Sequence, residues 1–265
     1  MELSYYIKNP SLRTDPRVTD LLGALSAAGH SVTECVSEVP AGCDMLLAVG
    51  GDGTFLDAAH LAGQAGVPLL GVNMGHMGFL SEYSPAEVEA ALSSGGFSVE
   101  LRDMLDVEGV GAESPCVLNE VGILRSGATI LSIEVEIDGH RLPTYFADGL
   151  LVSTPSGSTA YNLSAGGPIC APDVRALLLT PVSPHNLNLR PMVVPRSSVI
   201  AVRPFSKDGS GVMITLDNRT FNVASGSTVK IHASDFELKR VRPGKSGFFD
   251  ALRSKLFWGE DIRNV

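Results

Sequence analysis

The first hundred residues contain short apolar runs that alternate with segments of helical periodicity. The clearest run covers residues 44–49 (DMLLAV), and its almost wholly apolar character is typical of a parallel strand that is covered on both faces. Apolar positions recur at helical spacing over residues 15–28, and Gly29 follows as a stop. We predict strands over residues 3–7, 31–36, 44–49 and 68–73, and helices over residues 15–28, 54–64 and 85–92. This order of elements predicts an N-terminal, Rossmann-like parallel α/β domain with right-handed crossovers.

The second part of the chain shows a different pattern, in which apolar and polar residues alternate strictly. Apolar residues alternate with glutamates over residues 133–137, and Asp138-Gly139 supplies a hairpin turn. Alternation returns over residues 229–233 and 236–239. We therefore predict a C-terminal, mainly antiparallel β-sandwich domain with one helical interruption at residues 158–163.

The last stretch of the chain, residues 247–258, returns to a helical period. One face of this predicted helix is apolar and needs a surface that buries it, and the first domain is the natural host. We expect its basic residues Arg253 and Lys255 on the solvated face. The predicted domains are residues 1–95 plus 245–265, forming the α/β domain, and residues 96–244, forming the β-sandwich.

Composition and charge exclude several classes of protein. Hydrophobic residues make up 44% of the 265 residues and charged residues 18%, as in ordinary folded soluble proteins. The net charge of −9 argues against a nucleic-acid partner, because phosphate backbones require a concentrated basic surface. The N-terminus has no signal-peptide pattern and no apolar stretch reaches the length of a bilayer, so we expect a cytoplasmic protein with no membrane partner. The four cysteines have neither CxxC spacing nor nearby histidines, which argues against a disulfide framework or a zinc site.

A glycine-rich loop, Gly50-Gly51-Asp52-Gly53-Thr54, follows the apolar run directly and opens the next predicted helix. Glycines let a ligand approach the backbone, and the helix start supplies amides and partial positive charge that hold phosphate oxygens. Asp52 is then placed to accept the proton of a substrate hydroxyl, or to orient that hydroxyl and a metal–phosphate group. In the alternative interpretation the glycines only form a turn and Asp52 caps the helix. The loop matches neither G-x-G-x-x-G nor G-x-x-x-x-G-K-[ST].

Two histidines titrate near neutrality and are candidates for acid–base chemistry. Neither His76 nor His185 has a sequence partner that defines a triad or a metal site. We expect His76 to have a loop or packing role, and we expect the same packing role for Met74 and Met77.

Three further segments follow the glycine loop in order, and together the four carry a resemblance. They are residues 71–80 (GVNMGHMGFL), the pair Asn119-Glu120, and residues 148–168 (DGLLVSTPSGSTAYNLSAGGP). In this order they closely resemble the NAD kinases, the enzymes that convert NAD to NADP, and the resemblance covers most of the chain. The GGDGT element is shared with lipid kinases and phosphofructokinases, whereas the Asn-Glu pair and the last segment are far more specific.

The resemblance implies transfer of the ATP γ-phosphoryl group to the 2′-hydroxyl of the adenosine ribose of NAD, which regulates the NAD/NADP balance. It implies a divalent cation, expected to be Mg²⁺, and a homo-oligomer, expected to be a homodimer or homotetramer. It also implies the same two domains that the hydrophobic pattern predicts.

Residue roles follow from the resemblance position by position. Asp52 resembles the base for the 2′-hydroxyl and Gly53 its dinucleotide-contacting neighbour, while Gly50, Gly51, Gly53 and Thr54 form the phosphate loop. The NAD site implied is Asn119 and Glu120 on the ribose, Asp148 on the nicotinamide side, and Thr159, Ala160, Tyr161, Asn162, Leu163 and Ser164 in the adenine-side segment. No side chain is singled out as a metal ligand.

Two positions depart from the family pattern. Phe146 stands where many relatives carry Lys or Arg, and Arg219 stands where a glutamine is common near the ligand. Two other functions remain open at this point: a lipid or sugar kinase that shares only the GGDGT loop, and an NAD(P)-binding sensor that has lost turnover. The Asn119-Glu120 pair argues against the first and Asp52 against the second.

Overall fold

A computed structural model describes residues 1–75, 78–111, 116–244 and 247–258. The chain forms two compact units. The first unit contains residues 1–101 and 238–265, and the second contains residues 102–237. The hydrophobic pattern predicts the boundaries between the two domains near residues 95 and 245. The assignment of a function to each domain stays a prediction.

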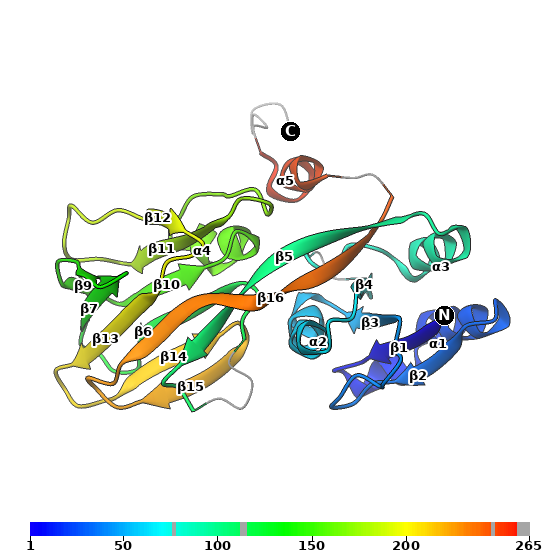
Figure 1. Ribbon diagram of the computed structural model, residues 1–265, viewed down its shortest axis with the longest axis horizontal. Coiled ribbons are helices and arrows are strands. Elements are labelled where there is room, and N and C mark those ends of the chain that lie inside the picture. The colour runs from blue at the N-terminus through cyan, green and yellow to red at the C-terminus, as the bar shows by residue number, and fades with distance from the viewer. Residues whose placement is uncertain (76–77, 112–115, 245–246, 259–265) are drawn as a thin grey trace. The chain divides into compact units, whose positions relative to one another are not determined.

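The first unit is built on parallel strands with helices on both faces (Figure 1). Its strands lie in the order β2 (Ser31–Glu34), β1 (Glu2–Tyr6), β3 (Met45–Gly50) and β4 (Leu69–Asn73), all parallel, and the last part of β16 (Val229–Pro243) pairs with β4 in the same direction. Its helices are the 3₁₀ helix η1 (Pro10–Thr14), α1 (Pro16–Ala27), α2 (Asp52–Ala65), α3 (Pro85–Ser94) and α5 (Phe248–Leu256).

Alternation along the buried strands assigns the helices to the two faces. Leu47, Val49 and Val72 point into a core that also contains Val18 of α1 and Val88 of α3. Strand residues one position away point to the opposite face. There Gly71 lies against Phe55 of α2. Because both faces are covered, β3 is completely buried, as the apolar run at residues 44–49 predicts.

The second unit is a β-sandwich of mainly antiparallel strands. Its six-stranded sheet has the order β12 (Met192–Pro195), β11 (Ala176–Val182), β10 (Gly149–Ser153), β6 (Glu120–Arg125), β14 (Val212–Leu216) and β15 (Arg219–Val223). The other layer contains β7 (Leu131–Ile137), β8 (His140–Arg141), β9 (Tyr145–Ala147), β13 (Ile200–Ser206), the first part of β16 and the second part of β5 (Phe97–Glu108). The short turns η2 (Ser156–Thr159) and α4 (Tyr161–Ser164) form the predicted helical interruption.

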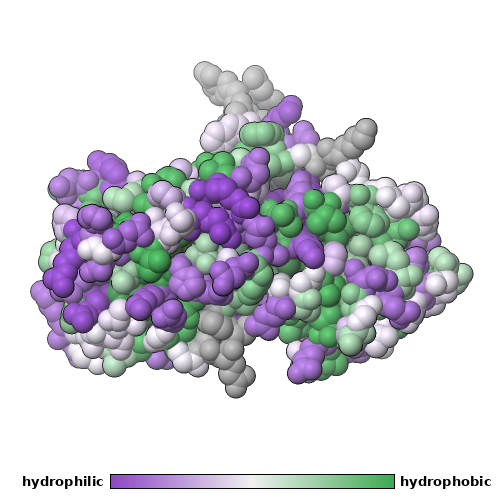
Figure 2. Space-filling view, in the orientation of Figure 1, coloured by the Kyte–Doolittle hydropathy of each residue, from purple (hydrophilic) through white to green (hydrophobic). Residues whose placement is uncertain are grey.

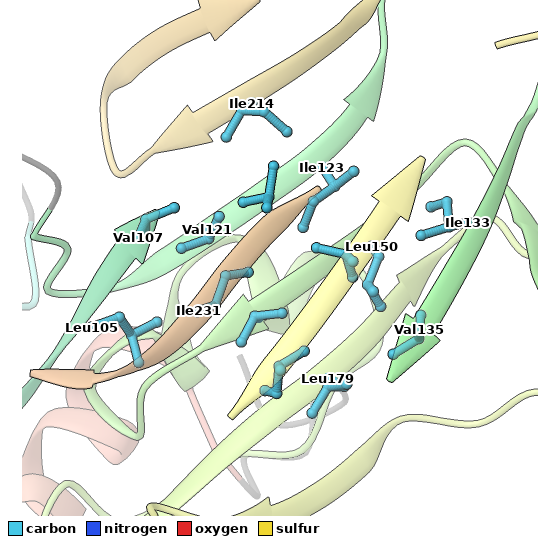
Figure 3. Packing of buried hydrophobic residues seen from close by; sticks show 14 of the residues in the cluster. Leu105, Val107, Val121, Ile123, Ile133, Val135, Leu150, Leu179, Ile214 and Ile231 are labelled. Atoms are coloured by element: carbon cyan, nitrogen blue, oxygen red, sulfur yellow. The ribbon is translucent and has the colours of Figure 1, made fainter. Parts of the chain in front are cut away.

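Side chains from both layers fill the core of the sandwich (Figure 3). Ile123 and Leu150 come from the six-stranded sheet, and Ile133, Val135 and Ile231 come from the other layer. The residues between them along each strand point outward, and this produces the alternation that the sequence shows. The predicted fold class, a parallel α/β domain followed by an antiparallel β domain, is confirmed.

Some details differ from the sequence-based expectation. The two alternating stretches near the end of the second domain form one continuous strand, β16, of 15 residues. Lys255 was expected on the solvated face of the last helix, and this expectation is wrong, because its side chain is only 17% exposed and pairs with Glu82. Arg253 is 73% exposed, as predicted.

The surface in Figure 2 is a mixture of hydrophilic and hydrophobic residues. Over the described parts of the chain, no helix is both long and apolar enough to cross a bilayer.

Candidate active site

The glycine loop joins the end of β3 to the first turn of α2. Gly51 is the N-cap of the helix, and it offers no side chain for capping. Asp52 is the first helical residue, and its side chain is half-buried, while Gly53 is exposed. The loop therefore presents the N-terminal amides of a 14-residue helix beside one carboxylate.

The Asp52 carboxylate binds three consecutive peptide groups of the segment that follows β4. Oδ2 accepts from the amide of Phe79 at 2.8 Å, and Oδ1 accepts from the amides of Leu80 and Ser81 at 3.0 Å each. A side chain at Gly78 would overlap this carboxylate, so only glycine permits the close approach. The interpretation of Asp52 as a helix cap is therefore wrong. A carboxylate offers about four acceptor sites, which leaves about one for another donor.

The pair Asn119-Glu120 lies at the start of β6 in the second unit, and both residues are buried. Asp217, in the turn between β14 and β15, holds their backbone. Its carboxylate accepts from the amides of Leu118 at 2.9 Å, Asn119 at 2.8 Å and Glu120 at 3.2 Å. The amide of Asp217 in turn donates to the carbonyl of Glu120. The turn thus fixes the direction in which both side chains of the pair leave the sheet.

Burial raises the pKa values of Glu120 and Asp217. Removal from water, and then the neighbouring Asp217, raise the pKa of Glu120 to about 8. Burial also raises the pKa of Asp217 to about 6, against the opposite effect of its three amide donors. The backbone of Tyr161 hydrogen-bonds to the Glu120 carboxyl, whereas Oε2 has no partner among the described residues. A protonated Glu120 near neutral pH can donate a hydrogen bond as well as accept one.

The turns after β10 pack tightly against Asn119. Thr154 donates to the carbonyl of Leu118 at 2.6 Å, and its amide donates to the carbonyl of Asn119 at 2.9 Å. A side chain at Gly157 would overlap the Asn119 carbonyl. The predicted adenine-side segment therefore lies beside the Asn119-Glu120 pair.

The members of this segment differ in exposure. Tyr161 is 40% exposed, Ser164 is exposed, and Thr159, Ala160 and Leu163 are partly buried. Asn162 has no exposed surface: its amide donates to the carbonyls of Ser158 and Pro168 and accepts from Thr180. In this structure the Asn162 side chain holds the segment in shape, and its role in binding stays a prediction.

Asp148 lies at the other end of the same strands. It precedes β10 and forms an ion pair with Arg125 at 2.8 Å, at the far end of β6. In the ladder between these strands, Glu120 is opposite Ser153. Asp148 precedes Ser153 by five positions, which is on the order of 17 Å along an extended strand. The structure thus does not bring Asp148 next to Glu120.

The positions that depart from the family pattern take part in local contacts. The Phe146 amide donates to Asn186 Oδ1 at 2.7 Å, and its carbonyl accepts from the amide of His185 at 2.7 Å, while its side chain is exposed. Arg219 Nη2 donates to the carbonyl of Cys116 at 2.6 Å. His76 and Met77 lie outside the described residues.

Three residues of the site were not predicted from the sequence: Asp217, Thr154 and Gly157. The signal for Asp217 was present, because Asp217-Asn218 separates two alternating runs as a two-residue hairpin turn does. Nothing in that local pattern tells which distant amides the carboxylate binds.

Comparisons with known proteins match both units of the chain to the same family. A family described as the ATP-NAD kinase N-terminal domain matches residues 12–94, and one described as the ATP-NAD kinase C-terminal domain matches residues 118–243. The chain is 39% identical to an NAD kinase of Bacteroides fragilis over 227 residues, covering 83% of this chain and 78% of the relative. It is 39% identical to an NAD kinase of Geotalea daltonii over 239 residues, covering 87% and 84%.

Two solved structures share the fold. Yeast NADH kinase, crystallised with NADH, superposes with a TM-score of 0.84 at 22% identity, covering 100% of this chain and 90% of the yeast chain. An NAD kinase from Archaeoglobus fulgidus, crystallised with ATP, superposes with a TM-score of 0.74 at 25% identity, covering 92% and 94%.

The raised pKa values of Glu120 and Asp217 predict a pH dependence of stability. In the folded protein both acids keep their protons from the ordinary values of 4.5 and 3.8 up to about 8 and 6. Between these pH values the folded protein binds more protons than the unfolded chain. The free energy of unfolding therefore has its full contribution from these acids below their ordinary pKa values and loses it as pH rises towards 8. We expect urea denaturation across this range to give a shallower pH dependence for Glu120→Gln than for the wild type. Glu134→Gln, which changes a 55% exposed acid of the same unit, serves as the control. Equal slopes for Glu120→Gln and the wild type would contradict a raised pKa of Glu120.

Proposed function

This chain belongs to the ATP-NAD kinase family, and from this premise we propose that it transfers the γ-phosphoryl group of ATP to the 2′-hydroxyl of the adenosine ribose of NAD, making NADP. One observation carries the residue-level proposal: a single carboxylate, that of Asp52, stands at the end of a glycine loop that opens a helix. Phosphoryl transfer requires mainly positioning and charge neutralisation, which such a loop supplies.

The glycine loop is the proposed phosphate site. The helix dipole of α2 places partial positive charge at its N-terminal end, beside the Asp52 carboxylate. Gly51 and Gly53 have no side chain that would keep a ligand from the backbone, and Gly53 is exposed, while Gly50 and Thr54 flank them in buried positions. The phosphates of ATP are the ligands that this arrangement favours, although the whole chain carries a charge of −9.

Asp52 is the proposed catalytic residue. Its three amide donors hold the carboxylate in one orientation, and its remaining acceptor site is the place for the 2′-hydroxyl of NAD. Accepting that hydrogen bond orients the hydroxyl oxygen towards the γ-phosphorus and gives its proton an acceptor as the new P–O bond forms.

The proposed dinucleotide site lies in the second unit. Asn119 and the protonated Glu120 offer donors and acceptors for ribose hydroxyls, and the exposed ring of Tyr161 offers a face to the adenine base. Thr159, Ala160, Asn162, Leu163 and Ser164 complete the proposed adenine side. Asp148, far along the strands from Glu120, suits the opposite end of an extended dinucleotide, the nicotinamide side.

Replacement of the carboxylate tests this assignment. Asp52→Asn keeps the size of the side chain but turns an NH₂ group towards at least one of the three amide donors. We expect NADP formation from NAD, ATP and Mg²⁺ to fall by about 10²- to 10⁴-fold in a coupled dehydrogenase assay. Asp57→Asn, on the same helix, is the matched control, because Asp57 pairs with Lys8 at 2.8 Å and should leave the rate unchanged. Wild-type rates in Asp52→Asn would rule out Asp52 as the catalytic group.

The divalent cation is proposed to enter with ATP. In the described portion of the chain no three His, Cys, Asp or Glu residues form a group that could hold a metal ion. Mg²⁺ commonly keeps several waters and binds through substrate phosphates, so the phosphates of ATP can bring it to the glycine loop. When bound, the cation would neutralise charge on the phosphates.

Chelation tests the requirement for the cation. We expect EDTA to abolish NADP formation and excess Mg²⁺ to restore it, while the melting temperature without nucleotide stays the same, because the residues that the structure describes form no preformed cage for the ion. Full activity in EDTA would contradict the proposal.

Two further properties are proposed from the family: a cytoplasmic location and a homodimeric or homotetrameric state. The exposed edge strand β12, which carries Met192 and Val193 at 37% and 54% exposure, supports association with another copy. We expect light scattering after size exclusion to give two or four times the chain mass of 27.9 kDa. A strictly monomeric, active protein would contradict the oligomer.

A further inference from the structure

The segment between β4 and α3 is held from two sides within the first unit. On one side Asp52 binds the amides of residues 79–81. On the other side cations bind carbonyls: Lys255 donates to the carbonyl of Gly78, and Arg240 Nη2 donates to the carbonyls of Phe79 and Leu80 at 2.9 and 3.0 Å. These two cations come from the C-terminal end of the chain, on α5 and β16.

The six contacts pair off in three peptide groups. The carbonyl of residue 78 and the amide of residue 79 belong to one planar trans peptide, and so do the next two carbonyl–amide pairs. Each of these planes therefore has a cation on its oxygen and the Asp52 carboxylate on its N–H. Hydrogen bonds in such a chain polarise and strengthen each other. The orientation of each plane, and with it the direction of each donor to Asp52, depends on the cation behind it.

Glu82 ties the cations together. Its carboxylate lies 2.7 Å from Lys255 Nζ, 3.0 Å from Arg240 Nη2 and 3.3 Å from Arg242 Nη2, and its side chain is 11% exposed. The Lys255 ammonium also lies 5.1 Å from the centre of the Phe79 ring. An aliphatic side chain at position 255 would lose the contacts of Lys255 with the Gly78 carbonyl, with Glu82 and with the Phe79 ring.

We propose that Lys255 is a positioning residue for phosphoryl transfer, which acts through the peptide at residues 78–79 on the Asp52 carboxylate. The proposal rests on the proposed function, and it adds a residue of the C-terminal helix to the machinery. Lys255 is a better test than Arg240, because Arg240 lies within β16 at 7% exposure and its loss removes two carbonyl contacts from the core.

The experiment compares Lys255→Met, Lys255→Arg and Arg253→Met in the full chain. Arg253 is the matched control, a basic residue of the same helix whose recorded contact is an exposed pair with Asp250 at 3.7 Å. For each variant we would measure the hydrogen-exchange rate of the Phe79 amide, kcat, KM for NAD and the melting temperature.

In Lys255→Met we expect exchange of the Phe79 amide to accelerate by about tenfold to a hundredfold, as the loss of one charge-assisted hydrogen bond implies. We expect kcat to fall by a similar factor of about tenfold or more. We expect KM for NAD to change much less than kcat, because most of the proposed dinucleotide residues lie in the other unit. Lys255→Arg restores part of both losses, and Arg253→Met behaves as the wild type.

The opposite results are equally clear. A lower melting temperature with unchanged kcat and unchanged Phe79 exchange would show that Lys255 only anchors the helix, and would overturn the proposal. An equal loss in Arg253→Met would overturn it too. The exchange measurement needs no substrate, so it tests the positioning even if Asp52→Asn shows that the proposed function is wrong.

Discussion

The hydrogen bonds between the Asp52 carboxylate and three consecutive peptide groups connect the elements that form the proposed phosphate site. They fix the segment after β4 against the first turn of α2. Because Asp52 is both the first residue of the helix and the acceptor for that segment, its orientation depends on the backbone of residues 78–81. That backbone in turn depends on Arg240 and Lys255, which hold its carbonyls.

The second unit uses the same physical device. Asp217 accepts from three consecutive amides, those of residues 118–120, as Asp52 does from residues 79–81. In each unit one carboxylate fixes a stretch of backbone that carries or supports the proposed chemistry. The consequences differ with burial. Asp217 and Glu120 lie close together inside the protein and have raised pKa values, whereas the half-buried Asp52 keeps room for another donor.

Hydrophobic patterns were sufficient to predict much of the fold. The run at residues 44–49 marks β3, because a strand covered on both faces has no polar positions. Alternation at residues 133–137 and the turn at Asp138-Gly139 mark β7 and β8. The same patterns could not show that residues 229–243 form one strand. The first part of this strand pairs with β13 and its last part pairs with β4, and these two partners keep it extended where its alternation is less regular.

By itself the sequence determined the fold class, the family and the glycine loop, because periodicity and contiguous motifs are written in neighbouring residues. Tertiary structure alone decided the partners of the charged groups. Asp52 was compatible with a cap or a base until its partners were found 27 to 29 positions away, and Lys255 resembled a solvated residue although it binds a carbonyl 177 positions away. Such contacts depend on how separate elements pack together, and no local pattern of residues encodes that packing.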